Sequence, residues 1–456
     1  MKILVVGGGS GGHITPAVAV VREILNLKPR CKVEFWTDRK YYANVVKITT
    51  EIGVAWGEED KRSGKRQYIR VRKVLSGKFR RYSGWKLTDY LEHPWVAFRD
   101  LVLLNIVGFF GFIAGIFQSF FRLFSKKSRP DVVFLKGGFV GLPVGVACRL
   151  LGIDYVVHES DAVPGLANRL LMRHAKLVAL SWDSSSSADA LLLRRTSSTA
   201  QSATPASSNS PQAKATPDTI VTGVPVAEEF RKVSATRQAQ LKRTFGFEPE
   251  APLVIITGGS QGAQHIDVTV REILPEMLKF TSVGLVAGRA HYEEMIDLKK
   301  YEIYEKAKLK SNFRMWAFNS AMHELLGAAD VIVSRAGATT IAEMAALSKA
   351  VILVPYAALP GGHQVKNAER LAKLGAAEVV PDEEMVKEPT LLLEAVRKLV
   401  RSPKLRAEMA AHLHETAVPD AAKRLAEILI NIAQKDFSEM EVEKPTPLEE
   451  AKEVEK

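Results

Sequence analysis

Glycine-rich turns that carry polar side chains recur along this 456-residue chain, each directly after a short apolar run. The segments are GGGSGGH at 7–13, GGSQGA at 258–263 and SRAGATT at 334–340. A turn of this kind between a strand and a helix directs backbone N–H groups and the positive end of a helix dipole towards a ligand, which favours phosphate. Two such turns in the C-terminal half, facing one cleft, predict a diphosphate site.

Further polar groups occupy similar positions after other apolar runs. Glu343, a turn into the helix expected after the third glycine segment, is suited to accept hydrogen bonds from ribose hydroxyls. Gln364 and Asn367 place amides after the last clear strand, while KGGF at 136–139 and HESD at 158–161 end two runs in the N-terminal half. Ligands of α/β proteins gather at the carboxyl ends of the strands. The pattern therefore predicts binding of sugars or nucleobases.

A dinucleotide-dependent dehydrogenase is the main alternative for the first glycine turn. Gly7, Gly9 and Gly12 satisfy the GxGxxG spacing, and Asp38 is a candidate for the acidic residue that binds a ribose. Two features disfavour this alternative: His13 puts an imidazole at the loop tip, and the second half repeats a glycine chemistry that one dinucleotide does not need. The absence of HExxH, CxxC and GxxxxGK[ST] motifs also disfavours zinc hydrolases and P-loop NTPases.

The elements that must position these groups follow an alternation of short apolar runs and helical patterns in both halves. This rhythm is typical of parallel sheets covered by helices on both faces. With the chain length, it predicts an α/β fold of two Rossmann-like domains facing an interdomain cleft. The expected boundaries are an N-terminal domain at 1–182, a low-complexity insertion or linker at 183–217, a C-terminal domain at 218–416, a helix at 417–434 and a polar tail at 435–456.

Charge and hydropathy single out one region of the N-terminal half. The net charge is +12, and Lys61–Lys86 holds eleven Lys or Arg and no Asp or Glu. Leu101–Phe121 follows, with 21 residues and no charge. We interpret it as a helix that dips into an anionic membrane surface beside the basic block, with a buried core helix and a spanning helix as alternatives. Few stacking aromatics accompany the basic block, so nucleic acid is not the expected partner.

Two further features concern the compartment. Cys31 and Cys148 are the only cysteines and cannot form a disulfide framework, so a reducing cytoplasm is expected. The first apolar run, Ile3–Val6, is too short for the apolar core of a signal peptide.

Seven motifs follow one another along the chain: GGGSGGHITPAVAV, KGGFVGLPVGVA, HESDAVPGLANR, TGVPV, ITGGSQGAQ, SRAGATTIAEMAAL and GGHQVKNAERL. In order and spacing they resemble those of the MurG family, the bacterial transferases that add GlcNAc to undecaprenyl-pyrophosphoryl-MurNAc-pentapeptide (lipid I). The resemblance covers residues 1–182 and 218–434. It implies the GT-B architecture, UDP-GlcNAc in the C-terminal domain, lipid I in the N-terminal domain, and an inverting transfer without metal or cofactor. It also implies a peripheral protein on the cytoplasmic side of the inner membrane.

The family's roles fall on matching positions of this chain. His13 is the first candidate for the base that takes the proton of the acceptor hydroxyl, because an imidazole titrates near neutral pH. Glu159 is the second candidate, with orientation of neighbouring groups as its other role. The resemblance implies these substrate-binding residues: Ser10, Gly11, Gly12, Asp161, Ser260, Asn319 (through its backbone), Ala338, Thr339, Thr340, Ile341, Ala342, Glu343 and Gln364.

The chain departs from the family pattern at two site positions. Asp161 stands where the family usually has Asn, and Ala227 stands where it has an arginine, for which Arg231 is a replacement candidate. Three alternatives to the family's activity remain open at this point. They are a related glycolipid transferase of the diacylglycerol type, a UDP-GlcNAc 2-epimerase, and a nucleotide-sugar binding module without turnover.

Overall fold

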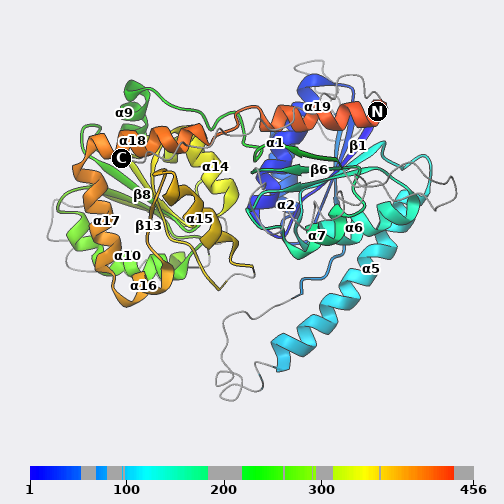
Figure 1. Ribbon diagram of the computed structural model, residues 1–456, viewed down its shortest axis with the longest axis horizontal. Coiled ribbons are helices and arrows are strands. Elements are labelled where there is room, and N and C mark those ends of the chain that lie inside the picture. Colours follow the sequence, from blue (N-terminus) through cyan, green and yellow to red (C-terminus); the bar gives the residue numbers. More distant parts are fainter. Residues whose placement is uncertain are drawn as a thin grey trace, which may run out of the picture.

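The computed structural model describes residues 1–52, 68–79, 95, 98–182, 218–259, 262–289, 291–293, 312–358 and 361–435. Within these ranges the chain forms two α/β domains, each built on one parallel sheet with helices on both faces (Figure 1). The predicted insertion, most of the basic block, Ser260 and the tail from 436 lie outside the described residues.

The N-terminal sheet has seven parallel strands in the order β3-β2-β1-β4-β5-β6-β7. They are β1 (Lys2–Val6), β2 (Lys32–Thr37), β3 (Tyr68–Lys73), β4 (Val132–Leu135), β5 (Tyr155–Glu159), β6 (Leu177–Leu180) and β7 (Asp218–Val221). The central strands β4, β5 and β6 are buried throughout, as expected of strands covered on both faces. Because all the strands are parallel, the turns that follow β1, β4 and β5 leave the sheet at one edge.

Helices cover both faces of this sheet. One face packs against α1 (Gly11–Leu27) and α19 (Ala421–Gln434), and the other against α6 (Gly138–Leu151) and α7 (Leu166–Met172). α2 (Tyr42–Ile52) lies beside β3. The C-terminal helix expected at 417–434 is therefore α19, and it returns from the second domain to the first, where it lies along α1 (Figure 1).

β7 corrects the expected start of the second domain at 218. Asp218–Val221 pairs in parallel with β6 and so completes the first sheet. The segment 183–217 therefore interrupts the connection between two strands of one sheet, and the chain crosses to the second domain after β7. A low-complexity composition predicts an interruption, but it carries no information about the sheet that the next strand joins.

The C-terminal sheet has six parallel strands in the order β10-β9-β8-β11-β12-β13. They are β8 (Leu253–Thr257), β9 (Ser282–Val286), β10 (Phe313–Trp316), β11 (Val331–Ser334), β12 (Ala350–Leu353) and β13 (Glu378–Val379). The helices are α9 (Ala235–Thr244), α10 (Gln264–Met277), α13 (Met322–Ala328), α14 (Ala338–Leu347), α15 (His363–Lys373), α16 (Asp382–Lys387), α17 (Thr390–Arg401) and α18 (Pro403–Glu415). Apolar clusters fill both faces of the sheet.

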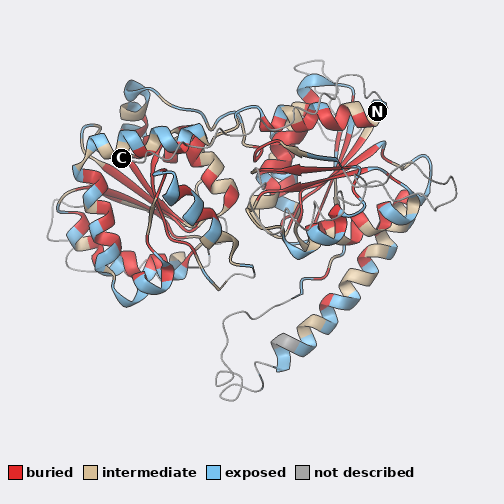
Figure 2. Cartoon of the chain, viewed as in Figure 1, coloured by how far each residue is buried: buried red, intermediate tan, exposed pale blue. Residues whose placement is uncertain are grey.

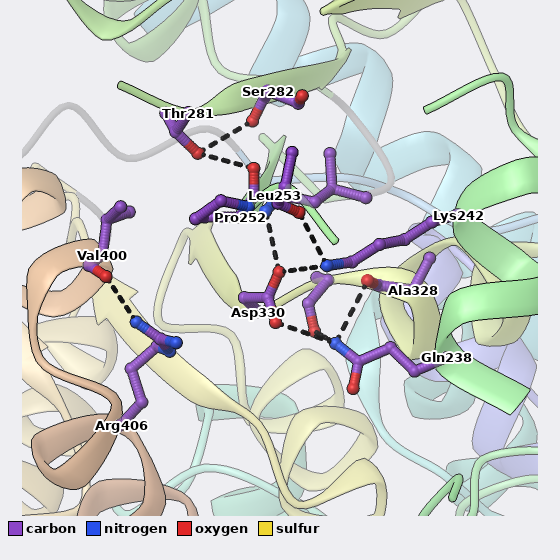
Figure 3. Close-up of polar contacts among 12 residues, drawn as sticks. Gln238, Lys242, Pro252, Leu253, Thr281, Ser282, Ala328, Asp330, Val400 and Arg406 are labelled. Atoms are coloured by element: carbon purple, nitrogen blue, oxygen red, sulfur yellow. Dashed lines mark hydrogen bonds and ion pairs between the residues drawn. The ribbon is translucent and has the colours of Figure 1, made fainter. Parts of the chain in front are cut away.

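A buried ionic network closes the amino-terminal edge of this second sheet (Figure 3). Asp330 Oδ2 lies 2.7 Å from the ammonium of Lys242 and accepts the backbone N–H of Leu253 at 2.8 Å. Its other oxygen accepts from the amide of Gln238 at 3.1 Å. The carboxylate thus joins α9 to the starts of β8 and β11, at the edge opposite the glycine turns.

The apolar segment at 101–121 forms most of one long helix, α5 (Leu104–Phe124), after a π-helical turn, η1 (Phe98–Leu103). α5 is the helix of the described residues that is long and apolar enough to cross a membrane. It extends away from the N-terminal domain and is largely exposed (Figures 1 and 2). The helix is therefore not a buried core element.

The two faces of α5 differ, which explains the polar residues and glycines in its sequence. The backbone at Gly108 and Gly111 lies close to the extended segment 74–79, where a Cβ would meet backbone carbonyls at 3.0 and 3.2 Å. Gln118 accepts the backbone N–H of Leu75 at 2.8 Å, and Arg122 donates to the carbonyl of Lys73 at 2.7 Å. The large apolar side chains face solvent instead. We call this exposed set the α5 apolar face: Ile106, Val107, Phe109, Phe110, Phe117, Phe121 and Phe124.

Candidate active site

The first glycine turn is held in place by Asp38 at the end of β2. Asp38 Oδ2 accepts the backbone N–H of Gly9 at 2.6 Å, and Oδ1 accepts those of Lys40 and Tyr41 at 2.8 and 3.2 Å. Gly9 has a φ of +82°, a conformation that favours glycine. A carboxylate fully occupied by its own loop is not available to a ribose, which removes the acidic residue that the dehydrogenase alternative requires.

His13 lies in the first turn of α1, with its ring against the KGGF turn at 136–139, which follows β4. A Cβ placed on Gly138 would lie 3.1 Å from His13 Cδ2, and Gly138 has a φ of +76°, so both the close approach and the backbone conformation favour glycine here. Nδ1 is buried and has no hydrogen-bond partner among the described residues. Burial, together with the positive charge of Lys136, lowers the pKa of His13 from 6.5 to about 4. The imidazole is therefore neutral at physiological pH and able to accept a proton.

Glu159 ends β5 and holds the loop that follows it. Oε1 accepts the backbone N–H of Asp161 at 3.0 Å, and Oε2 accepts from Gly165 N at 3.0 Å and from the side-chain amide of Asn168 at 2.8 Å. Burial and the negative charge of Asp161 raise the pKa of Glu159. Both oxygens are engaged with the protein, so the geometry favours the orienting role over that of a base.

Two contacts join the domains where these turns meet. Asn367 of α15 is buried; its amide nitrogen donates to Asp161 Oδ1 at 3.2 Å, and its oxygen accepts the backbone N–H of Ala162 at 3.1 Å. The hydroxyl of Thr339, in the first turn of α14, donates to the carbonyl of Gly12 at 2.9 Å. A helix start predicted to bind the donor thus touches the loop that carries His13.

In the second domain, the predicted phosphate-binding turns leave the carboxyl ends of β8 and β11. Ala338 and Ile341 have buried side chains, so only their backbones remain for a ligand. Thr340 and Ala342 are partly exposed on the same helix. Ser260, in the turn after β8, lies outside the described residues.

Glu343, one turn into α14, is a carboxyl without a partner in the described part of the chain. Burial alone raises its pKa from 4.5 to about 8. A carboxyl group held at a helix start without hydrogen bonds of its own suits the predicted contact with ribose hydroxyls.

The remaining predicted residues sit in turns at the same edge. Gln364 Oε1 accepts the backbone N–H of Tyr356 at 3.0 Å, which orients the amide and leaves its nitrogen without a partner among the described residues. Asn319 Oδ1 accepts the backbone N–H of Ala321 at 2.8 Å, so its side chain shapes the turn after β10. Ser10 caps α1 without a side-chain hydrogen bond, and Gly11 opens that helix.

Lys136 belongs to the KGGF turn expected near the site, but the sequence assigned it no role of its own. It follows β4 and is buried, and its ammonium hydrogen-bonds the hydroxyl of Ser160. The available signal was a charged residue directly after an apolar strand, at the edge where the other candidates gather. Within the described residues, no group of three or more His, Cys, Asp or Glu side chains is placed to hold a metal ion.

Comparison with known proteins identifies the family to which the chain belongs. Residues 98–180 match the N-terminal domain of glycosyltransferase family 28, and residues 253–425 match its C-terminal domain. A protein from Bacillus pumilus is 31% identical over 434 residues, which are 95% of this chain and 99% of that protein. One from Bacillus cytotoxicus is 30% identical over 436 residues, 95% of this chain and 100% of that protein. Both are named UDP-N-acetylglucosamine–N-acetylmuramyl-(pentapeptide) pyrophosphoryl-undecaprenol N-acetylglucosamine transferase.

Solved structures confirm the GT-B architecture but do not separate the activities that use it. MurG of Acinetobacter baumannii superposes with a TM-score of 0.59 at 22% identity, covering 94% of this chain and 99% of that one. A UDP-GlcNAc 2-epimerase from Neisseria meningitidis reaches the same 0.59 at 15% identity, covering 94% and 100%. The relatives in sequence decide between the two, because their similarity spans nearly the whole of both chains. The chain belongs to the family of UDP-N-acetylglucosamine–N-acetylmuramyl-(pentapeptide) pyrophosphoryl-undecaprenol N-acetylglucosamine transferases.

Proposed function

We propose that this chain transfers GlcNAc from UDP-GlcNAc to the 4-hydroxyl of MurNAc in lipid I, which yields lipid II for peptidoglycan synthesis. The observation that carries the proposal, beside the family, is the direct contact between Thr339 and Gly12. It joins a helix start suited to a diphosphate to the loop that bears a neutral imidazole at His13. A donor and a base are thereby brought to one place.

The chemistry follows from this arrangement. The acceptor oxygen attacks the anomeric carbon of GlcNAc while the bond from that carbon to the UDP oxygen breaks, and the configuration inverts. The hydroxyl proton passes to His13, which is neutral and has a free ring nitrogen. Negative charge develops on UDP, where the N-terminus of α14 and the glycine turn after β8 stabilise it.

The other site residues bind and orient the substrates. Glu343 accepts hydrogen bonds from the ribose, Gln364 binds GlcNAc hydroxyls, and the backbone at Asn319 meets uracil. Glu159 orients the loop that carries Asp161, which lies on the acceptor side of the interdomain contact. Ser10 and Gly11 belong to the loop that closes on the donor.

A direct assay tests the proposed function. Purified protein is incubated with UDP-GlcNAc and a short-chain lipid I analogue, and UDP release and the disaccharide product are measured. We expect both products in equal amounts, and none with diacylglycerol as the acceptor. Release of UDP with diacylglycerol, or conversion of UDP-GlcNAc to its 2-epimer without an acceptor, would replace the proposal by one of those activities. Tight UDP binding without turnover would identify a binding module.

Glu343 provides a specific prediction for the donor. Glu343→Ala is expected to raise the KM for UDP-GlcNAc about 10- to 100-fold, because it removes the carboxyl group that hydrogen-bonds the ribose hydroxyls. Glu343→Gln keeps an acceptor and should show an intermediate KM. Steady-state kinetics at saturating acceptor give both values, with Glu369→Ala, an exposed carboxylate on α15, as the matched control. A KM unchanged in Glu343→Ala contradicts the ribose contact.

We further propose that the α5 apolar face docks the N-terminal domain on the cytoplasmic surface of the membrane that holds lipid I. Phe110 and Phe121 are 66% and 70% exposed, and segment 74–79 adds the exposed Leu75 and Phe79. Lys126 and Lys127 follow α5 and supply charge for anionic headgroups. The opposite face of the helix is hydrogen-bonded to the protein, which supports a position in the membrane interface.

Membrane docking is tested by vesicle flotation. Replacing Phe110, Phe117 and Phe121 together by serine is expected to reduce co-flotation with phosphatidylglycerol-containing vesicles at least about tenfold, since it removes apolar area from the interface. Activity on a water-soluble acceptor analogue should persist. Leu374→Ser, an exposed apolar residue of the second domain, serves as the control. Unchanged flotation of the triple variant rules out docking through α5.

A further inference from the structure

Lys136 is a buried cation beside the proposed base, and the mechanism above gives it no role. Its backbone N–H donates to the carbonyl of Val6 at 3.0 Å, which fixes the residue between the ends of β4 and β1. Only 1% of the residue is exposed. Removing an ammonium from water is costly unless its surroundings compensate. If this position only had to fill space in the core, an apolar side chain would do so without the free-energy penalty of burying a charge.

The surroundings of Lys136 keep it charged near neutral pH. Its ammonium makes one hydrogen bond within the described residues, to the hydroxyl of Ser160. Burial lowers the pKa of Lys136 from 10.5 to about 8, against the opposing effect of the carboxylates of Glu159 and Asp161. Both oxygens of Glu159 are already engaged by the loop. The ammonium is thus a cation at pH 7 with no carboxylate of the described residues in direct contact.

This charge acts on two histidines at the carboxyl edge of the first sheet. Lys136 disfavours the protonated form of His13, and it acts in the same direction on the buried His158. The other charged or titratable groups that face His13 are Asp161, which favours protonation, and His363 of the second domain, which opposes it. Lys136 is the strongest of these charges, second only to burial.

Lys136 also stands in a series of contacts that ends at the second domain. The ammonium holds Ser160, and the next residue, Asp161, accepts a hydrogen bond from Asn367. A shift of the ammonium therefore moves the turn through which the acceptor side meets the donor side.

We propose that Lys136 is a positioning residue for the transfer: its buried ammonium fixes the Ser160–Asp161 turn that meets Asn367 of the second domain, and its charge opposes protonation of His13. The expected effect on kcat rests on the proposed function, whereas the effect of the Lys136 charge on His13 titration does not. The electrostatic part is a property of the protein without substrates.

Histidine titration by NMR tests the electrostatic part. With ¹³C-labelled histidine, the His13 signal is assigned by its loss in His13→Gln. In Lys136→Gln, which keeps a donor for Ser160 but loses the charge, the His13 titration is expected to move upward by about one pH unit, because a like charge has been removed. Lys136→Arg should leave it near its wild-type position. An unmoved titration in Lys136→Gln overturns the proposal, and Lys136→Met provides the neutral side chain if the glutamine variant does not fold.

Kinetics test the positioning part. Ser160→Ala keeps the charge but removes its hydrogen-bond partner, so we expect an unchanged His13 titration and a kcat reduced about tenfold, with the KM for UDP-GlcNAc within about twofold of wild type. In Lys136→Gln the acidic limb of the kcat/KM profile should move upward with the His13 titration. A wild-type kcat in both variants contradicts positioning. An absence of transfer in the wild-type protein, with the NMR shift present, refutes the proposed function and leaves the electrostatic role standing.

Discussion

Replacing His13 by alanine is expected to lower kcat about 10²- to 10⁴-fold, the usual contribution of a positioned general base. The reason is geometric as well as electrostatic. The ring lies against Gly138, where a Cβ would crowd it at 3.1 Å, and Nδ1 is buried without a partner in the described structure. A neutral imidazole whose Nδ1 has no partner in the described structure can accept a proton, whereas both oxygens of Glu159 are occupied.

The measurement is steady-state transfer from UDP-GlcNAc to a lipid I analogue, with kcat and KM determined separately. The KM for the donor should change by less than about threefold, because the base acts on the acceptor hydroxyl in the transition state. His412→Ala, on the exposed surface of α18, provides a control histidine that should behave as wild type. A His13→Ala variant that keeps its kcat and loses only donor affinity would assign His13 to donor binding instead.

Burial of His13 also makes the stability of the folded protein depend on pH. The folded pKa of His13 is about 4 and its ordinary value is 6.5, so between these pH values the unfolded chain binds the proton more readily. Wild-type stability should therefore fall as the pH decreases from 6.5 towards 4, and His158, whose pKa is also lowered, contributes in the same direction. Urea unfolding of His13→Ala should show a shallower decrease over this range.

The sequence predicted the two sheets and the edge at which the candidate site lies. A glycine-rich turn after an apolar strand marks the carboxyl end of that strand, and in a parallel sheet these ends share one edge. The turn at 7–12 and the helix start at 338–343 appear where the pattern placed them. What a single carboxylate does there was harder to predict. Asp38 follows β2 and Glu159 ends β5, and the sequence predicted both to be available to ligands, yet each carboxylate is fully hydrogen-bonded to its own loop. Hydrogen bonds from loop backbone have no signature in side-chain spacing.

Contacts between the domains could not be predicted from the sequence either. The pairs Thr339–Gly12 and Asn367–Asp161 join residues more than 200 positions apart. Their partners depend on how two separately folded sheets face each other. The alternation of strands predicts each sheet but not that orientation, and even the membership of β7 in the first sheet follows only from the tertiary pairing.

Fold and activity also separate clearly in this protein. A transferase and an epimerase superpose on the chain equally well, so the architecture alone permits both reactions. Two features of this chain suit a transferase with a lipid-linked acceptor. They are the α5 apolar face, which we propose docks on a membrane, and His13, which we propose accepts the proton of the acceptor hydroxyl.

Replacing Asp330 by alanine is expected to destabilise the second domain by about 3–5 kcal/mol, because it leaves buried cations without their counter-charge. Lys242 is 5% exposed and loses its ion pair. Lys349, which donates to the carbonyls of Gly327 and Ala329 at 2.7 and 2.8 Å, loses the nearby negative charge that favours its protonated form. Glu250→Ala, an exposed carboxylate of the same domain, should change stability by less than about 0.5 kcal/mol.

The pH dependence of this loss identifies its cause. The pKa of Lys349 is about 8 in the folded protein, and its ordinary value is 10.5. Between these pH values the unfolded chain binds the proton more readily, so stability rises as the pH increases from about 8 to 10.5. In Asp330→Ala the deficit measured by urea unfolding should therefore be smaller at pH 10 than at pH 7, since Lys349 can shed its uncompensated proton. A deficit that is equal at both pH values would point to lost hydrogen bonds to Leu253 and Gln238 rather than to unpaired charge. In either case transfer activity under folded conditions should persist, because this network lies at the edge of the sheet opposite the glycine turns.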